Sequence, residues 1–466
     1  MRYAVAIVLI VVMSPFSGIV SGEYERDRIE NSESSSIMES YSIPVQLAFD
    51  RAEDISRYSQ DEILSTKEWL IVTGIPLNEH TKSLSNPISS FETKVLPGSY
   101  IWEMEDGGKA IESLTKAMEI GEIESFSPVI KMEHTRKFYP NDPEFGSQWH
   151  LENSGQTGGL SGEDANLTGA WDSYNGSGVV ISIVDDGLDI SHPDIAPNYD
   201  QSASYDWCND DSDPTPLSFD GHGTAAAGVA GATGNNSIYV SGAAFGASLA
   251  GSTLIACSIN DFDESQALSY ENDYIDIYSN SWGPSDTGRI LDGPGPLMTA
   301  AFENDVFQGR DGLGNIITWA AGNGLTNDDD SNYDGYANSR YTIAVTAITH
   351  LGEQSYYAEP GANILVAAHS NGDGEAITTT DIVGSGGYNS SGNVTDTFGG
   401  TSSATPLVSG VIALMLEANQ NLTWRDVQHI LVNTARVNDP SDSSWEINGA
   451  GHDVSHKYGF GAVDAS

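Results

Sequence analysis

From about residue 138 onward, short apolar segments alternate with helices of small residues, and glycine-rich turns separate them. The clearest strand segments are Val179 to Val184, Ile316 to Ala320 and Tyr341 to Ala347. Strands that alternate with helices predict an α/β fold built on a mostly parallel sheet. Reacting groups gather at the carboxyl ends of the strands in such sheets, so polar residues at these ends are the first candidates for chemistry.

A smaller α/β region precedes this large one. Its apolar positions have helical spacing across residues 108–119, and three segments have strand character: Trp69 to Ile75, Ser99 to Met104 and Phe126 to Ile130. The region ends at Thr135-Arg136-Lys137, before an irregular proline-containing stretch. The chain therefore divides into a small domain of residues 23–137 and a large domain of residues 138–466.

Residues 1–22 predict a secretory signal peptide, because Arg2 precedes the apolar run Ala4 to Met13. The run is too short to span a bilayer, and no later stretch reaches the length of a membrane span. We therefore expect a secreted or cell-surface protein with no membrane span apart from the signal. Cys208 and Cys257 permit at most one disulfide, and the sequence leaves their pairing open.

The charge balance is strongly acidic, with 66 Asp and Glu against 19 Lys and Arg, and a pI near 4.1. This balance argues against nucleic acid as a partner. Most of the basic residues precede residue 138, so the large domain carries the acidic excess. Three explanations stay open: an acidic surface suited to high salt, calcium sites, and a groove for basic substrates.

Three polar residues stand at the ends of predicted elements. Asp185 directly follows a buried strand, and His222 opens a helix of small residues. Ser402 comes just before an apolar helix, with Pro406 predicted in the first turn, where a missing N–H is tolerated. Alone, each residue fits a turn or a helix cap. Together, in the order Asp, His, Ser, they predict a catalytic triad at strand and helix ends.

The motifs around these residues resemble the three subtilase signatures: Val184-Asp185-Asp186-Gly187, His222-Gly223-Thr224 and Gly400-Thr401-Ser402. Four further segments resemble the kexin/furin branch of proprotein convertases: residues 279–284, 321–324, 334–336 and 422–427. The resemblance covers about residues 140–466. It implies a subtilisin-like, mostly parallel twisted sheet flanked by helices, with Asn323 as a donor of the oxyanion hole. It also implies that residues 23–137 are a ferredoxin-like inhibitory prodomain, cleaved by the enzyme itself after Lys137.

The resemblance further implies which residues bind the substrate. Asp286 and Asp334 match positions that hold a basic side chain next to the cut, and Asp186 matches a position for the residue before it. Glu264 and Asp292 match positions for a basic residue further out. The segment Ser281, Trp282 and Gly283 completes the expected substrate-binding set.

Calcium is the cofactor that the resemblance implies. Oxygen-only ligand sets suit this hard cation, which takes six to eight ligands. The expected ligands form three sets: Asp142, Asp194 and Asn236; Asp286, Asp329 and Glu359; and Asp206, Asp211 and Asp213.

These features together predict a calcium-dependent serine endopeptidase that cleaves polypeptides after basic, often paired, residues, with its own prodomain as an intramolecular inhibitor. Two alternatives are a broad-specificity degradative subtilase of a salt-adapted organism and an inactive calcium-binding scaffold domain. Because the family carries a β-sandwich P domain after the catalytic domain, we also expect the chain to be truncated before that domain.

Overall fold

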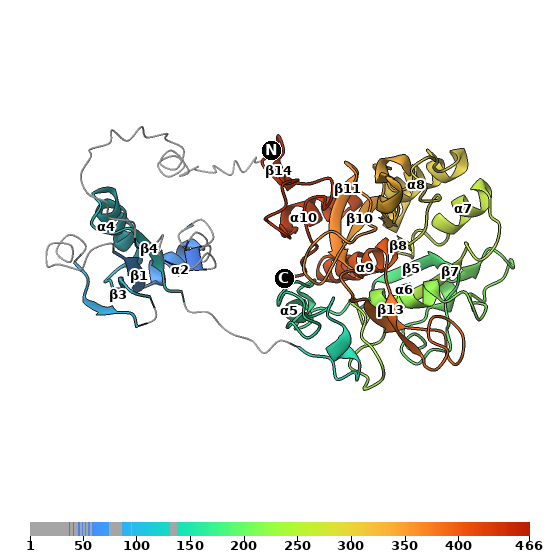
Figure 1. The fold of residues 1–466 in the computed structure, drawn as a ribbon, viewed down its shortest axis with the longest axis horizontal. Coiled ribbons are helices and arrows are strands. Elements are labelled where there is room, and N and C mark those ends of the chain that lie inside the picture. The colour runs from blue at the N-terminus through green and yellow to red at the C-terminus, as the bar shows by residue number, and fades with distance from the viewer. Residues whose placement is uncertain are drawn as a thin grey trace, which may run out of the picture. The chain divides into compact units, whose positions relative to one another are not determined.

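The computed structural model describes residues 58–73, 86–94, 96–130 and 138–466, with a few isolated positions between 37 and 55. The chain forms two compact units, Met1–Thr135 and Arg136–Ser466 (Figure 1). The predicted signal peptide and the predicted cleavage site after Lys137 lie outside the described residues. The roles of the two units as prodomain and peptidase domain stay predictions.

The first unit contains a four-stranded antiparallel sheet in the order β2-β3-β1-β4. Trp69, Trp102, Leu114 and Phe126 form its core. The predicted strands and helix are present, whereas β2 was missed because its side chains are mostly exposed and show no apolar run. The elements are α2 (Gln60–Ser65), β1 (Glu68–Val72), β2 (Ser89–Glu92), β3 (Ser99–Glu103), α4 (Gly107–Glu119) and β4 (Ser125–Pro128).

The second unit is built on a seven-stranded parallel sheet in the order β11-β10-β9-β8-β5-β7-β6. Most strand residues are buried, as expected where helices cover both faces of a parallel sheet. The predicted α/β class is therefore confirmed. The strands are β5 (Val180–Asp185), β6 (Tyr205–Asp206), β7 (Ser248–Thr253), β8 (Ile277–Asn280), β9 (Ile316–Ala320), β10 (Ile343–Ile348) and β11 (Ile364–His369).

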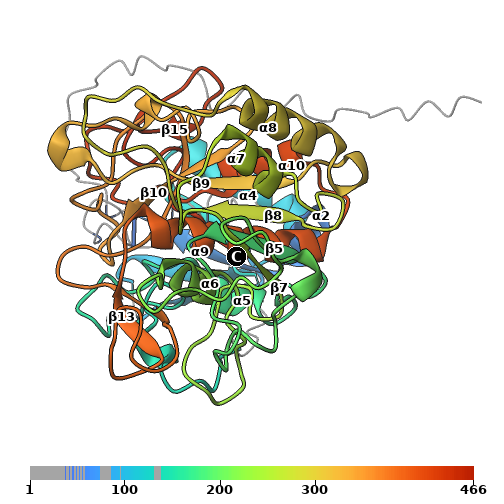
Figure 2. The ribbon, with the colours of Figure 1, turned by 90° about the vertical axis from the view of Figure 1, so that its right-hand side faces the viewer.

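Helices α6 (His222–Gly231) and α9 (Thr401–Ala418) pack together on one face of this sheet, opposite α7 (Asp261–Leu268), α8 (Pro296–Gln308) and α10 (Trp424–Thr434) (Figure 2). Small residues allow this close packing. A Cβ atom on Gly410 of α9, for example, would lie 2.9 Å from the carbonyl oxygen of Ala230 in α6. Within the described chain, α9 is the one helix long and apolar enough to cross a membrane, and 83% of it is buried in this unit.

Smaller elements complete the second unit. Helix α5 spans Leu167–Ala170, β12 (Ile377–Thr380) pairs with β13 (Val394–Phe398), and β14 (Glu446–Ile447) pairs with β15 (Asp453–Val454). A disulfide joins Cys208 to Cys257, which settles the pairing that the sequence left open. The bond ties the loop after β6 to the segment after β7.

Candidate active site

Three elements carry the residues of the predicted triad. Asp185 is the last residue of β5, His222 is the first residue of α6, and Ser402 is the second residue of α9. The Nδ1 atom of His222 lies 2.9 and 3.0 Å from the two carboxylate oxygens of Asp185. The Asp185 side chain is 1% exposed and that of His222 is 27% exposed, so the carboxylate is buried behind an imidazole that solvent still reaches.

The charges around His222 favour its protonated form. Burial alone would lower the pKa of His222, but Asp185 and Asp186 outweigh burial and raise that pKa to about 9. Asp186 also accepts hydrogen bonds from the backbone N–H groups of His222 and Gly223, at 3.1 and 2.7 Å. Burial, followed by the charge of Asp185, raises the pKa of Asp186 to about 7. The predicted substrate residue Asp186 therefore caps the helix that carries the catalytic base.

Ser402 exchanges two hydrogen bonds with Ser281, which directly follows β8. The Ser402 hydroxyl donates to the Ser281 carbonyl at 3.2 Å, and the Ser281 hydroxyl donates to the Ser402 carbonyl at 3.1 Å. Pro406 lies four residues after Ser402 and has no N–H to give this carbonyl, so Ser281 supplies the missing donor. The helix begins at Thr401, which places Pro406 in the second turn and corrects the prediction that it lies in the first.

Asn323 lies beside the N-terminus of α9. Its side-chain oxygen accepts hydrogen bonds from the backbone N–H of Thr401 at 2.8 Å and from the Thr401 hydroxyl at 3.1 Å. These bonds orient the Asn323 amide and leave its Nδ2 group as the donor predicted for the oxyanion hole. Gly400 has a φ of 75°, and a Cβ there would lie 3.2 Å from Asn323 Oδ1, so glycine fits this close approach. Sequence reasoning missed Thr401 as the residue that orients Asn323.

A cavity of about 210 Å³ opens next to Ser402 and Asn323. Ser281, Trp282 and Gly283 line it, as predicted for a substrate-binding segment, and Asp286 and Asp334 contribute carboxylates. Asp334 accepts hydrogen bonds from the backbone N–H groups of Tyr336 and Ala337 at 2.7 and 3.3 Å. Burial is the main cause that raises the pKa of Asp334 to about 7, and Asp286 and Asp292 add to it. The cavity thus holds a half-buried carboxylate with no basic partner among the described residues.

The two outer predicted acids lie around the same region. Glu264 accepts a hydrogen bond from the Tyr336 hydroxyl at 2.9 Å, and Tyr336 stacks on Trp319 beneath the cavity wall. The pKa of Glu264 is raised by burial and by Asp261 and Asp292. Asp292 is exposed and its backbone bridges to that of Asp334. Both acids are therefore linked to the cavity through the segment 334–336.

The first predicted calcium set is gathered around one loop. Asp142 accepts hydrogen bonds from the backbone N–H groups of Asn235, Asn236 and Ser237. Asp194 accepts from the Asn236 amide at 2.9 Å and from the Val240 backbone at 3.0 Å. Burial raises the pKa of Asp194, and the charge of Asp142 adds to this shift. The two carboxylates therefore lie at one loop, but the Asn236 group that faces Asp194 is its Nδ2, while its oxygen accepts a hydrogen bond from the Ile238 backbone N–H.

The second set surrounds Gly324, where a Cβ atom would lie 2.7 Å from that of Asp329, 2.9 Å from that of Asp286 and 2.9 Å from the Glu359 carboxylate. Burial, then the neighbouring charges of Asp286 and Asp329, raises the pKa of Glu359 to about 8. A divalent cation would offset this repulsion, so the donor chemistry of the set fits calcium. Asp286 also accepts a hydrogen bond from the Asn323 backbone at 2.9 Å, which connects this set to the oxyanion donor.

The third set lies in one turn, where the backbones of Asp206 and Asp211 pair with each other. Both oxygens of Asp206 accept hydrogen bonds within its own turn, from Cys208 and Asn209. The Asp211 carboxylate accepts a hydrogen bond from the backbone N–H of Asp213. The Asp213 carboxylate in turn accepts hydrogen bonds from the backbone N–H and the hydroxyl of Thr215. No group of three or more His, Cys, Asp or Glu side chains in the described part of the chain has an arrangement that could hold a metal ion on its own. Backbone oxygens would have to complete either of the first two sites.

The arrangement supports nucleophilic acyl transfer. His222 can take the proton of the Ser402 hydroxyl, and Asp185 holds the imidazole in the required orientation. The backbone N–H of Ser402 lies in the first turn of α9, where N–H groups have no helical partner and the helix dipole is positive. Together with Asn323, it can stabilise a developing oxyanion.

Comparisons with known proteins agree with this geometry. Residues 176–461 match the model of the subtilase family. A PC3-like endoprotease of Hydra vulgaris, variant B, is 43% identical over 336 residues, which cover 70% of this chain and 46% of the relative. Human furin is 40% identical over 333 residues, which cover 70% of this chain and 40% of furin. The chain therefore spans less than half the length of these relatives.

A solved structure also resembles the second unit. The serine protease of Aeromonas sobria is 28% identical and superposes with a TM-score of 0.66, covering 72% of this chain and 68% of that protein. This likeness agrees with the parallel sheet and its two helical layers (Figure 2).

We expect a serine-directed covalent inhibitor to label Ser402, faster as the pH rises and His222 loses its proton. Because Asp186 helps to raise the pKa of His222, Asp186→Asn should move this rise to lower pH. Labelling rates measured by mass spectrometry across the neutral and alkaline range test this shift. Asp311→Asn, an exposed carboxylate in a turn after α8, serves as the matched control. An unshifted profile in Asp186→Asn, or labelling of Ser402→Ala, would contradict the assignment.

Proposed function

The chain belongs to the subtilase family, and on this basis we propose that it is a serine endopeptidase that cleaves polypeptides after basic residues. The observation that carries the proposal is the position of the half-buried Asp334 carboxylate, in the cavity that opens beside Ser402. A substrate side chain in that cavity places the following peptide bond at the nucleophile. A guanidinium or ammonium group there would neutralise a carboxylate that burial otherwise disfavours.

The proposed reaction uses the triad in its established roles. The Ser402 hydroxyl attacks the scissile carbonyl while His222 Nε2 takes its proton, and Asp185 stabilises the resulting imidazolium. Asn323 Nδ2 and the Ser402 N–H then donate to the oxyanion; one such donor is worth about 2.7–4 kcal/mol of barrier. His222 returns the proton to the leaving amine, and water repeats the sequence to release the acyl group.

Removal of the Asp334 charge tests the specificity. We expect Asp334→Asn to lower kcat/KM for peptides cleaved after Arg by roughly thirtyfold or more, since truncating a desolvated charge pair costs about 2–5 kcal/mol. Peptides with a neutral residue at the same position should lose much less. Asp311→Asn, which removes an exposed charge outside the predicted substrate-binding set, is the matched control.

A peptide panel that varies the residue before the cut measures both effects. Preference of the wild type for Leu or Phe over Arg would indicate a broad degradative subtilase and contradict the proposal.

Calcium is the cofactor we propose for the first two ligand sets. Asp142, Asp194 and Asn236 would hold one ion, and Asp286, Asp329 and Glu359 would hold another. When bound, each ion supplies positive charge that offsets repulsion between buried carboxylates. Asp286 also accepts a hydrogen bond from the Asn323 backbone N–H. An ion bound to the second set would therefore help to hold Asn323, the proposed oxyanion donor, in position.

We expect chelation to lower the melting temperature, because an ion that binds only the folded state adds about 2.7 kcal/mol at a hundredfold excess over Kd. Asp194→Asn should shrink the difference between the calcium-loaded and chelated melting temperatures, and readdition of calcium should restore the wild type. Differential scanning calorimetry measures these shifts. Equal melting temperatures with calcium and with excess chelator would rule out structural calcium sites.

We also propose that the protein passes through the secretory pathway and that the first unit inhibits the second until it is cleaved off. The disulfide between Cys208 and Cys257 supports an oxidising compartment. The separate core of the first unit supports its role as an independently folded segment. The assignment of residues 23–137 as prodomain and 138–466 as peptidase domain belongs to this proposal.

Expression of the full chain tests maturation. We expect the wild type to yield a mature N-terminus at Phe138, whereas Ser402→Ala should keep the first unit attached, because the nucleophile performs the cleavage. N-terminal sequencing and intact mass distinguish the two forms. Cleavage of Ser402→Ala at the same bond in a host without related proteases would contradict self-processing.

A further inference from the structure

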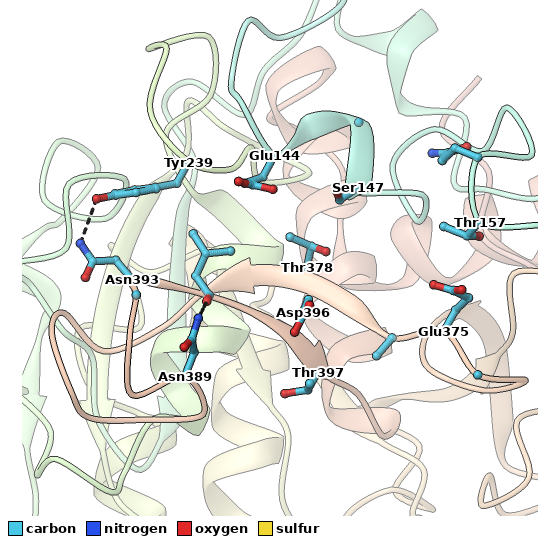
Figure 3. A pocket seen from close by; sticks show the side chains of 16 residues that line it. Glu144, Ser147, Thr157, Tyr239, Glu375, Thr378, Asn389, Asn393, Asp396 and Thr397 are labelled. Carbon is cyan, nitrogen blue, oxygen red and sulfur yellow. Dashed lines mark hydrogen bonds between the residues drawn. The ribbon is translucent and has the colours of Figure 1, made fainter.

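We propose that a second, acidic cavity binds a basic side chain of the substrate on the leaving-group side of the scissile bond. The inference rests on the proposed endopeptidase function and adds a specificity site to it. This cavity, here called the acidic groove, has a volume of about 800 Å³ and lies over one face of the hairpin β12–β13 (Figure 3). Glu144, Glu375 and Asp396 bring three carboxylates to its lining.

The three carboxylates are free to bind a cation. Glu144 precedes the turn Phe145–Ser147, Glu375 precedes β12, and Asp396 belongs to β13, so three separate segments supply the charge (Figure 3). Glu144 and Glu375 are half-buried and Asp396 is exposed. None of them forms an ion pair with a described residue. The acidic groove therefore concentrates negative charge that the protein itself leaves uncompensated.

Hydroxyl groups in the lining also lack partners. Thr378, in β12, is 5% exposed and lines the acidic groove, and its hydroxyl has no hydrogen-bond partner among the described residues (Figure 3). The hydroxyl oxygen of Thr157, in the same lining, is buried and equally unpartnered. The Thr378 hydroxyl therefore has hydrogen-bonding capacity that the protein leaves unused, which suits a polar ligand in the acidic groove, whereas the Thr157 oxygen has no surface that a ligand could reach.

The spacing of the carboxylates favours a side chain over a metal ion. Figure 3 shows Glu144, Glu375 and Asp396 distributed along the acidic groove instead of converging on one point. These three carboxylates do not form a group that could hold a metal ion. A Lys or Arg side chain carries several donors at the end of a long stem, which suits carboxylates and hydroxyls spread over such a cavity.

The acidic groove lies on the side where the leaving segment departs. The acyl side of the substrate occupies the cavity with Asp334, and His222 gives its proton to the leaving amine. The ring of His222 packs against Phe398, the last residue of β13, with 5.4 Å between their centroids. The leaving segment therefore passes the end of β13, and Asp396 and Thr397 of the acidic groove directly precede Phe398.

An irregularity in the hairpin directs both of these residues outward. Ile377 pairs with Phe398 and Thr379 pairs with Thr395, so Asp396 and Thr397 together oppose Thr378. Such a β-bulge re-aims side chains, and here Asp396 and Thr397 are exposed while Phe398 is buried. Because an extended chain advances about 3.3–3.6 Å per residue, roughly the second to fourth residues after the scissile bond reach the acidic groove.

Peptides that share one acyl side and carry Arg or Ala at successive leaving positions test the inference. We expect the wild type to favour Arg over Ala at one of these positions by about three- to tenfold in kcat/KM, and added salt should reduce this ratio. Glu375→Gln combined with Asp396→Asn should bring the ratio close to one. Glu303→Gln, an exposed carboxylate removed from α8, is the matched control and should keep the wild-type ratio.

The outcomes separate this inference from the proposed function. If the wild type cleaves after basic residues but its ratio stays near one at every leaving position, the groove inference is wrong and the function stands. If Glu375→Gln combined with Asp396→Asn leaves the Arg-to-Ala ratio of kcat/KM unchanged, the groove inference is also wrong. A ratio abolished by added calcium, but not by the same ionic strength of sodium chloride, would identify an ion site instead. If the wild type cleaves no peptide, both the proposed function and the groove inference are wrong.

Discussion

The exchange of two hydrogen bonds between Ser281 and Ser402 is the contact on which the site depends. It joins the end of β8 to the first turn of α9, and it exists because Pro406 leaves the Ser402 carbonyl without a helical donor. Thr401, the neighbouring residue, orients Asn323 after β9. The nucleophile and the oxyanion donor therefore take their positions from the same helix end. Since α9 is buried across β8 to β11, the sheet itself fixes that position.

Many of the excess acidic side chains act as hydrogen-bond acceptors for the backbone. Buried or half-buried carboxylates such as Asp186, Asp334 and Glu359 accept hydrogen bonds from backbone N–H groups and so hold loops and helix ends in place. Burial and mutual repulsion raise their pKa values. Few basic side chains are present to neutralise them, and the described Arg and Lys ion pairs involve other acids. Cations from outside the chain, in the substrate and as calcium, are the complement that we propose.

The hairpin β12–β13 contacts His222 on one side and lines the acidic groove on the other. Its buried face carries Phe398 against His222, and Thr379 donates to a carbonyl of α6. Its other face lines the acidic groove. One small, irregular sheet thus supports the catalytic base and also presents charge to the leaving segment, which explains how specificity on that side can change without altering the triad.

The sequence by itself determined the α/β class, the main strands and the placement of the three predicted triad residues at element ends, because apolar runs and the polar residues that end them are local signals. Asp185 at the end of a strand and His222 at the start of a helix could be predicted from their neighbours alone. Only the tertiary structure decided which distant groups meet: the bond between Cys208 and Cys257, the Ser281 contact that replaces a helical donor, and the outward turn of Asp396. These depend on residues far apart in the chain, whose proximity arises only when the sheet and its helices pack.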